Sequence, residues 1–156
     1  MLMNKIFLLI ICVLIGYLPS LSAFFVKVGE WYNALNKPPL NPPAWVFGPA
    51  WTLLYLLIGI SLFNFIVNSS GKPERKKGLI FFTVQHVLNF SWTPLFFYFH
   101  SISGALAVII LMQIFIILTI VTFHKSCRLS AILLLPYLGW VLFASYLNLF
   151  LLILNR

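Results

Sequence analysis

The chain has 156 residues, of which 62% are hydrophobic and only 8% are charged, and its formal net charge is +8. Soluble domains are about half apolar and roughly a quarter charged, and a chain this short leaves much of its surface in contact with solvent. These values exclude an ordinary soluble protein. Because a bilayer offers backbone groups no hydrogen bond partner, apolar spanning segments fold as helices, and we predict an all-α integral membrane protein.

Five hydrophobic segments follow one another along the chain with short connections. A helix rises about 1.5 Å per residue, so a hydrocarbon core of roughly 30 Å takes about 20 residues. The predicted spans cover residues 5–26, 44–67, 78–99, 103–123 and 129–154. They use nearly the whole chain, so we expect a single five-helix transmembrane domain over residues 1–156.

The first segment resembles a signal peptide, because a positive charge opens it and small residues end it at Leu21-Ser22-Ala23. Its apolar run is longer than usual for such a peptide, and cleavage would leave four spans. We therefore expect this segment to be retained. Residues 27–43 follow as the longest connection, and their four prolines predict a loop rather than a continuous helix.

The positive charges predict how the chain sits in the membrane. The amino terminus and the second and fourth connections fall on one side, while Lys27, Lys37 and Arg156 fall on the other. The first side is the more basic one, with Lys5, Lys72, Arg75, Lys76, Lys77, Lys125 and Arg128. Because positive charge stays inside, we expect a cytoplasmic amino terminus and an external proline-rich loop.

Composition also argues against several kinds of partner and chemistry. The basic residues form no patch interleaved with aromatic side chains, so nucleic acid is not an expected partner. Cys12 and Cys127 lie in unrelated segments, which predicts neither a disulfide nor a metal site. The only acids, Glu30 and Glu74, lie in connections, whereas proton relays and acid–base sites in membranes need carboxylates within the spans.

His86, His100 and His124 are too scattered along the chain for a metal cluster. We therefore expect no metal ion, no required cofactor and no assigned catalytic residue.

Amide and aromatic residues recur at helical spacing in three predicted spans, which places each set on one helix face. The sets are Trp51, Tyr55 and Gly59; Gln85, Asn89 and Trp92; and Trp140, Ala144 and Asn148. Each set alone fits helix packing in the membrane, but three together favour a shared apolar pocket with a few fixed donors. Pro49 and Pro136 fit either a kink or a carbonyl left free beside such a pocket.

Three blocks of the sequence resemble the tryptophan-rich sensory protein/translocator protein family, also called the peripheral-type benzodiazepine receptor family. The first block runs from Trp31-Tyr32 through Lys37-Pro38, Pro42-Pro43, Trp45 and Gly48-Pro49 to Trp51, Leu54-Tyr55 and Gly59. The second is Gln85, Asn89, Trp92, Pro94 and Phe96-Phe97, and the third is Pro136-Tyr137-Leu138, Trp140, Phe143-Ala144 and Leu147-Asn148. The resemblance covers essentially the whole chain.

The resemblance implies five transmembrane helices around a pocket that the first loop covers as a lid. It also implies binding of porphyrins and other tetrapyrroles and, in many members, a homodimer. The family's pocket positions fall here on Trp51, Tyr55, Asn89, Trp140 and Ala144, and its lid positions on Tyr32 and Pro42. Leu149-Phe150-Leu151 lacks the sterol motif of animal members, so sterol binding is not expected.

The sequence thus favours a membrane receptor or carrier for flat tetrapyrroles, with the bilayer and the tetrapyrrole as its partners. The expected ligand-binding residues are Tyr32, Pro42, Trp51, Tyr55, Gln85, Asn89, Trp92, Trp140, Ala144 and Asn148. One alternative is an enzyme that degrades porphyrin with light or oxygen, for which Trp51 and Trp140 are the candidate catalytic residues. Another is a regulatory membrane protein that only senses the ligand.

Overall fold

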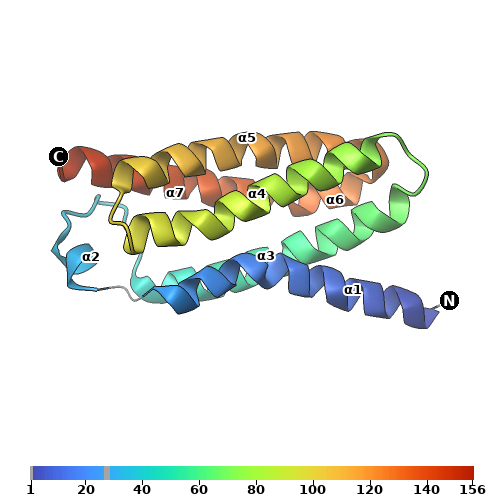
Figure 1. The fold of residues 1–156 in the computed structure, drawn as a ribbon, viewed down its shortest axis with the longest axis horizontal. Coiled ribbons are helices and arrows are strands. Elements are labelled where there is room, and N and C mark those ends of the chain that lie inside the picture. The colour runs from blue at the N-terminus through green and yellow to red at the C-terminus, as the bar shows by residue number, and fades with distance from the viewer. Residues whose placement is uncertain (1, 27–28) are drawn as a thin grey trace.

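The computed structural model describes residues 2–26 and 29–156, and every regular element within them is a helix. The long helices run side by side along one axis, with the amino terminus at one end and the carboxyl terminus at the other (Figure 1). The elements in chain order are α1 (Leu2–Tyr17), η1 (Leu18–Phe25), α2 (Glu30–Ala34), α3 (Ala44–Asn68), α4 (Glu74–Phe97), α5 (Ile102–Ser126), α6 (Arg128–Leu133) and α7 (Leu135–Leu154). Lys27 and Val28 of the predicted loop lie outside the described residues.

Four stretches are long and apolar enough to cross a membrane, namely Asn4–Phe24, Ala44–Asn68, Ile102–Ser126 and Arg128–Leu154. The all-α class is therefore confirmed, and the chain is a multi-pass membrane protein. The predicted third span corresponds to α4, which opens with charged residues and carries Gln85, His86 and Asn89 in its interior. These polar residues lower its hydropathy, so the count of five spans stays a prediction.

Two of the predicted spans are not single α-helices, although each still forms a stretch long and apolar enough to cross a membrane. The first changes from α-helix to the tighter 3₁₀-helix η1 at Leu18, with Pro19 in the first turn of η1. The last is divided at Leu134, where α6 ends and Pro136 occupies the first turn of α7. Proline lacks an amide hydrogen and is tolerated in a first turn, so both breaks fall where the sequence offers a new helix start.

Two glycines let α1 and α3 approach each other closely. A Cβ atom added at Gly16 would lie 2.5 Å from the backbone oxygen of Tyr55, and one added at Gly59 would lie 2.6 Å from the Cα atom of Val13. No side chain fits at such distances, so the two backbones meet directly. Gly59, predicted within an aromatic stripe, therefore serves helix packing.

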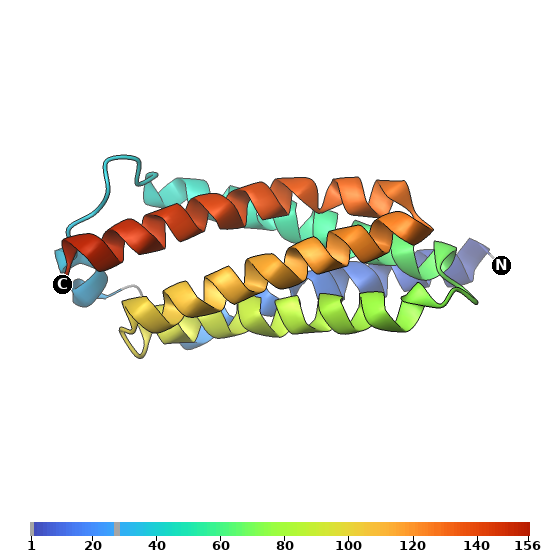
Figure 2. The same cartoon turned by 90° about the horizontal axis from the view of Figure 1, so that it is seen from above.

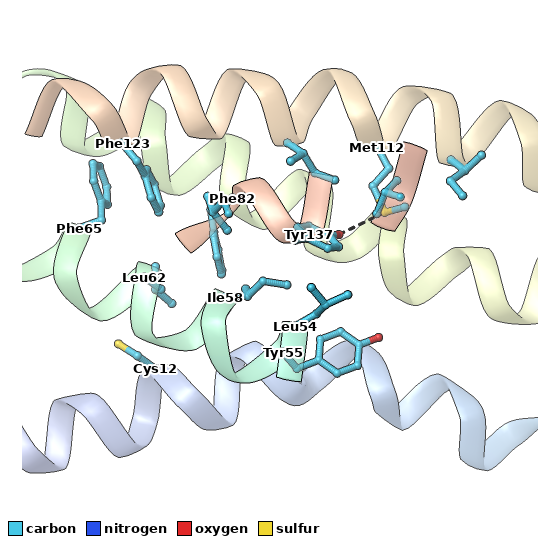
Figure 3. Close-up of a cluster of buried hydrophobic side chains, with 14 residues drawn as sticks. Cys12, Leu54, Tyr55, Ile58, Leu62, Phe65, Phe82, Met112, Phe123 and Tyr137 are labelled. Carbon is cyan, nitrogen blue, oxygen red and sulfur yellow. Dashed lines mark hydrogen bonds between the residues drawn. The ribbon is translucent and has the colours of Figure 1, made fainter. Parts of the chain in front are cut away.

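An aromatic core closes the half of the bundle near the amino terminus. Phe65 of α3 stacks on Phe123 of α5 with centroids 3.8 Å apart, and Phe82 of α4 stacks on Phe123 at 6.1 Å (Figure 3). Phe65 and Phe123 are fully buried. The Ser61 hydroxyl of α3 donates to the backbone oxygen of Ser130 in α6 at 2.7 Å.

The helices separate toward the other end of the bundle. Figure 2 shows the second half of α7 and the first half of α5 diverging toward this end. The two helices pack together nearer the middle of the bundle, where Gln113 of α5 donates to the Ser145 hydroxyl of α7. α3 contacts α6 extensively and α7 only slightly. The space between α3 and α7 is therefore left for something other than helix packing.

Candidate functional site

A cavity of about 900 Å³ occupies the half of the bundle opposite the aromatic core. Its walls come from α1, η1, α3, α4, α5, α7 and the loop between η1 and α3. Ligand pockets in proteins span roughly 300–1,000 Å³, so the space is large enough for a sizeable organic molecule. Most of the lining side chains are apolar or aromatic.

Nine of the ten residues expected from the sequence to bind a ligand line this one cavity. They are Tyr32, Pro42, Trp51, Tyr55, Asn89, Trp92, Trp140, Ala144 and Asn148. Gln85 is the exception, because it is 1% exposed and lies behind the wall. Its amide bonds to His86 and Tyr137 instead. The three helix faces inferred from spacing thus converge.

Trp51 of α3 and Trp140 of α7 form the central part of the wall. Their ring centroids lie 6.5 Å apart with the planes at 84°, and Trp51 also stacks on Tyr55 at 5.1 Å. Phe47 packs edge-on against Trp140 at 5.9 Å. Neither the Trp51 nor the Trp140 indole N–H has a hydrogen bond partner among the residues that the structure describes, so both can donate to a bound molecule.

Trp92 and Asn148 line the cavity but are held by the protein itself. The Trp92 indole N–H donates to Asn148 Oδ1 at 3.2 Å, and Asn148 Nδ2 donates to the backbone oxygen of Ile102 at 2.9 Å. This pair connects α4, α7 and the start of α5. Its donors are already engaged, so we assign it to fixing the wall.

A chain of buried hydrogen bonds runs from the cavity wall into the bundle. The Tyr55 hydroxyl donates to Asn89 Oδ1 at 3.4 Å, and Asn89 Nδ2 donates to the Tyr137 hydroxyl at 2.8 Å. Tyr137 donates to Gln85 Oε1 at 2.9 Å, and Gln85 bonds to His86 at 2.9 Å. The chain links α3, α4 and α7, and it satisfies amides that would be costly in an apolar interior.

The loop contributes the only charged side chain that lines the cavity within the described residues, Lys37. Its Nζ atom lies 4.9 Å from the centre of the Tyr32 ring and donates to the backbone oxygen of Asn33 at 3.2 Å. Burial raises the pKa of the Tyr32 phenol, against a smaller opposing effect of Asn41. Tyr32 is therefore neutral at physiological pH, and Lys37 gives this wall a positive charge.

A pair of amides ties the loop to the end of α7. The backbone N–H of Asn36 donates to Asn155 Oδ1 at 2.9 Å, and Asn155 Nδ2 donates to the backbone oxygen of Asn36 at 3.0 Å. We call Asn36 and Asn155 the latch. The loop is also held by Trp31, which stacks on His100 with centroids 4.2 Å apart.

Most of the other residues of the wall were not predicted from the sequence. They are mainly aromatic or apolar, and include Tyr17, Phe47, Phe96, Phe97 and Met112. Phe96-Phe97 stands within a block that resembles the family, so that signal was present. Tyr17 and Met112 carry no motif that distinguishes them from neighbouring packing residues.

The arrangement is suited to binding more than to bond cleavage. Within residues 2–26 and 29–156, no three His, Cys, Asp or Glu side chains lie close enough together to hold a metal ion. The polar groups in the cavity wall are indoles, hydroxyls, amides and one lysine. Such groups orient a flat apolar molecule through a few directed hydrogen bonds.

Comparison with known proteins gives a consistent result along the chain. Residues 8–154 match the TspO/MBR family. The chain is 39% identical over 146 residues to a tryptophan-rich protein TspO from Chlorobaculum tepidum, covering 93% of this chain and 91% of that protein. It is 46% identical over 136 residues to the protein of the same name from Archaeoglobus fulgidus, covering 86% of this chain and 87% of that protein.

A eukaryotic relative extends the similarity. The chain is 36% identical over 138 residues to the human translocator protein, covering 83% of this chain and 81% of that protein. Residues 8–154, which match the family, contain α1 to α7 apart from the first turns of α1, and they contain the residues that line the cavity. The family assigned from the three sequence blocks is therefore confirmed, and this chain belongs to the TspO/MBR family.

Proposed function

We propose that the protein is a membrane receptor or carrier that binds tetrapyrroles of the porphyrin type in the cavity between α3, α4 and α7. One observation carries the proposal: Trp51 and Trp140 face a single cavity of about 900 Å³, and their indole N–H groups have no partner in the part of the chain that the structure describes. A flat macrocycle stacks well on aromatic rings and needs few polar contacts.

The position of Lys37 supports a ligand with acidic groups at its edge. In the proposed complex the macrocycle packs against the two indoles, and its carboxylates reach the loop. Lys37 then pairs with one of them, because its Nζ is otherwise bonded only to backbone oxygens among the described residues. The apolar end of the macrocycle lies toward Ile109 and Met112 of α5.

We also propose that α4 crosses the membrane as a fifth span. It is 24 residues long, and its side chains Gln85, His86 and Asn89 are buried. A helix whose amide and imidazole side chains face the bundle can still present a mainly apolar surface to lipid. The basic residues of the α3–α4 connection lie at the same end as the amino terminus (Figure 1), and we propose that this end is cytoplasmic.

The direct test is a titration of the purified protein with protoporphyrin, followed by porphyrin absorbance so that the readout does not depend on which tryptophan remains. Trp51→Phe and Trp140→Phe each remove one indole donor and part of the stacking surface, so each is expected to weaken binding about tenfold. Trp45→Phe is the matched control, because Trp45 is 75% exposed and lies outside the cavity wall. Unchanged affinity in both cavity variants would disprove the site.

A further inference from the structure

The backbone oxygen of Ile15 determines which atoms donate and which accept along the hydrogen bond chain behind the cavity. His86 Nε2 lies 2.9 Å from the oxygen of Ile15, and a carbonyl can only accept, so Nε2 carries a hydrogen. His86 is buried, and the two acids of the chain lie in the first turns of α2 and α4, away from it. A buried ring without a counter-ion is neutral, which leaves Nδ1 as an acceptor.

Each following link is then forced. Gln85 Nε2 donates to His86 Nδ1 at 2.9 Å, so Gln85 presents its oxygen to Tyr137. The Tyr137 hydroxyl donates to that oxygen at 2.9 Å, since the Met112 sulfur at 3.4 Å is the weaker acceptor (Figure 3). Tyr137 has only one hydrogen, so its oxygen must accept from Asn89 Nδ2 at 2.8 Å.

The consequence appears at the cavity wall. Because Asn89 Nδ2 is held by Tyr137, the other atom of its amide, Oδ1, is turned toward Tyr55. Asn89 and Tyr55 line the cavity, whereas Gln85, His86 and Tyr137 do not. The Tyr55 hydroxyl and Asn89 Oδ1 are 3.4 Å apart, well beyond the usual 2.7–2.8 Å for two oxygens. A fixed acceptor therefore stands beside a weakly engaged donor.

We infer that, among the flat ligands that stack on Trp51 and Trp140, the cavity binds more tightly those with an N–H and a C=O side by side on one edge, as in a secondary lactam. Tyr137 and Gln85 set this preference without touching the ligand. The ligand N–H donates to Asn89 Oδ1, and the ligand C=O accepts from the Tyr55 hydroxyl. This inference rests on the proposed function. Among tetrapyrroles, the linear ones with terminal lactam rings present such an edge, and closed porphyrin rings do not.

The experiment compares two ligands with the same bilin skeleton, and the Tyr137→Phe variant controls for the added methyl groups. One is biliverdin, with N–H lactams, and the other is its bis-lactim methyl ether, in which the lactam oxygens are methylated and the ring nitrogens become acceptors. An acceptor facing Asn89 Oδ1 is unpaired, and a buried unpaired group reduces affinity substantially. Biliverdin is therefore expected to bind the wild-type protein about tenfold more tightly than the ether.

Tyr137→Phe separates a positioning role from a structural one. Without the hydroxyl, the Asn89 amide is free to turn and donate Nδ2 to the ether nitrogen. The ether is then expected to bind more tightly than it does to the wild type, and the affinity ratio to fall to about twofold or less. A merely structural loss would weaken both ligands together and leave the ratio unchanged.

Two further variants complete the design. Gln85→Met breaks the same chain one link further back and is expected to lower the ratio as well, which covers the case in which Tyr137→Phe does not fold. Tyr146→Phe removes a hydroxyl that has no hydrogen bond partner among the described residues and lies outside the cavity wall. The ratio of the affinities for biliverdin and its ether is therefore expected to stay at the wild-type value in this variant.

The outcomes distinguish this inference from the function on which it rests. If the wild-type protein binds neither these ligands nor protoporphyrin, the proposed function fails. If the protein binds tetrapyrroles but shows no preference for the lactam, or keeps a tenfold preference in folded Tyr137→Phe, the inference is overturned and the function stands.

Discussion

The two halves of the bundle use aromatic residues in opposite ways. In the closed half, Phe65, Phe82 and Phe123 stack on one another and leave no room between the helices. In the open half, Trp51 and Trp140 stand against a cavity. Both halves contain aromatic side chains, so the presence of aromatic residues does not by itself decide between core and pocket.

Backbone spacing accounts for the difference. Gly16 and Gly59 allow α1 to pack closely on α3, and α6 also packs on α3, so the helices of the closed half lie close together. A new helix, α7, begins at Leu135 and packs on α5 rather than on α3. We expect the packing of the closed half to fix the spacing of the helices that wall the open half. Substitutions in each half test this difference.

The largest effect is expected in the closed half. Gly59→Leu inserts a side chain where even a Cβ atom would lie 2.6 Å from the backbone of α1. Overpacking of this kind costs about 3 kcal/mol or more, so the melting temperature in detergent is expected to fall by roughly 10 °C. Porphyrin binding is lost as the walls move.

Gly139→Ala is the control for that variant, because a Cβ atom at Gly139 meets nothing within 4 Å. Its melting temperature is expected to equal that of the wild type. Equal melting of Gly59→Leu and the wild type would show that α1 and α3 are not in close contact.

The latch is expected to control how long a ligand stays in the open half. Asn155→Ala removes two hydrogen bonds to the backbone of Asn36, each worth about 1 kcal/mol. The loop then opens more often, and stopped-flow measurements are expected to show porphyrin dissociating about tenfold faster. Asn68→Ala, which removes an amide bonded only within α3, leaves the rate unchanged. A wild-type rate in Asn155→Ala would mean that the loop is not a lid.

A smaller effect is expected at Lys37. Lys37→Met removes the positive charge from the loop wall, and since a partly exposed ion pair is worth up to about 1 kcal/mol, affinity for protoporphyrin falls about fivefold. The dimethyl ester of the same porphyrin has no carboxylates, so its affinity stays constant. Lys76→Met, on the exposed first turn of α4 at the other end, serves as the control. Equal losses for acid and ester would argue against the ion pair.

The smallest effect concerns Cys127, between α5 and α6. Burial opposes ionisation of its thiol, but hydrogen bonds with Ser130 and Leu129 and the charge of Lys72 outweigh it and lower the pKa. The thiolate is thus present at lower pH than for an ordinary cysteine, and a membrane-impermeant maleimide is expected to react with it readily at pH 7. Buried Cys12 does not react.

Labelling of Cys127 also tests the proposed orientation. In sealed vesicles of known orientation, the maleimide is expected to react only from the cytoplasmic face and to leave porphyrin affinity unchanged, because Cys127 belongs to the closed half. Cys127→Ser abolishes the labelling. Reaction from the opposite face would reverse the topology.

The sequence was sufficient for the helices and for the aromatic and amide centre of the cavity wall, but not for most of the wall's other residues. Hydrophobic runs give helix ends to within a few residues, and spacing of i, i+4 and i+7 identified faces that do converge, as Trp51, Asn89 and Trp140 illustrate. Periodicity within one helix says which residues share a face, but not which residues lie in front of them. Gln85 shares a face with Asn89 and is nevertheless covered.

The hydrogen bond chain and the break between α6 and α7 could not be predicted from the sequence, because they depend on contacts between distant segments. The bond from His86 to Ile15 joins residues 71 positions apart, and that from Tyr137 to Gln85 joins residues 52 apart. In the sequence His86 is only one of three scattered histidines, because its partner, the α1 backbone, is brought to it only in the packed bundle. The break at Leu134 likewise follows from Pro136 together with the packing of α6 on α3.

The most direct test of the account is a structure of the protein with a bound porphyrin. We expect the macrocycle inside the cavity, in contact with both Trp51 and Trp140, with a carboxylate beside Lys37 and the phenylalanine core unchanged. A porphyrin bound on the lipid-facing surface, with both indoles free of contact, would contradict the assignment of the open half as the binding site.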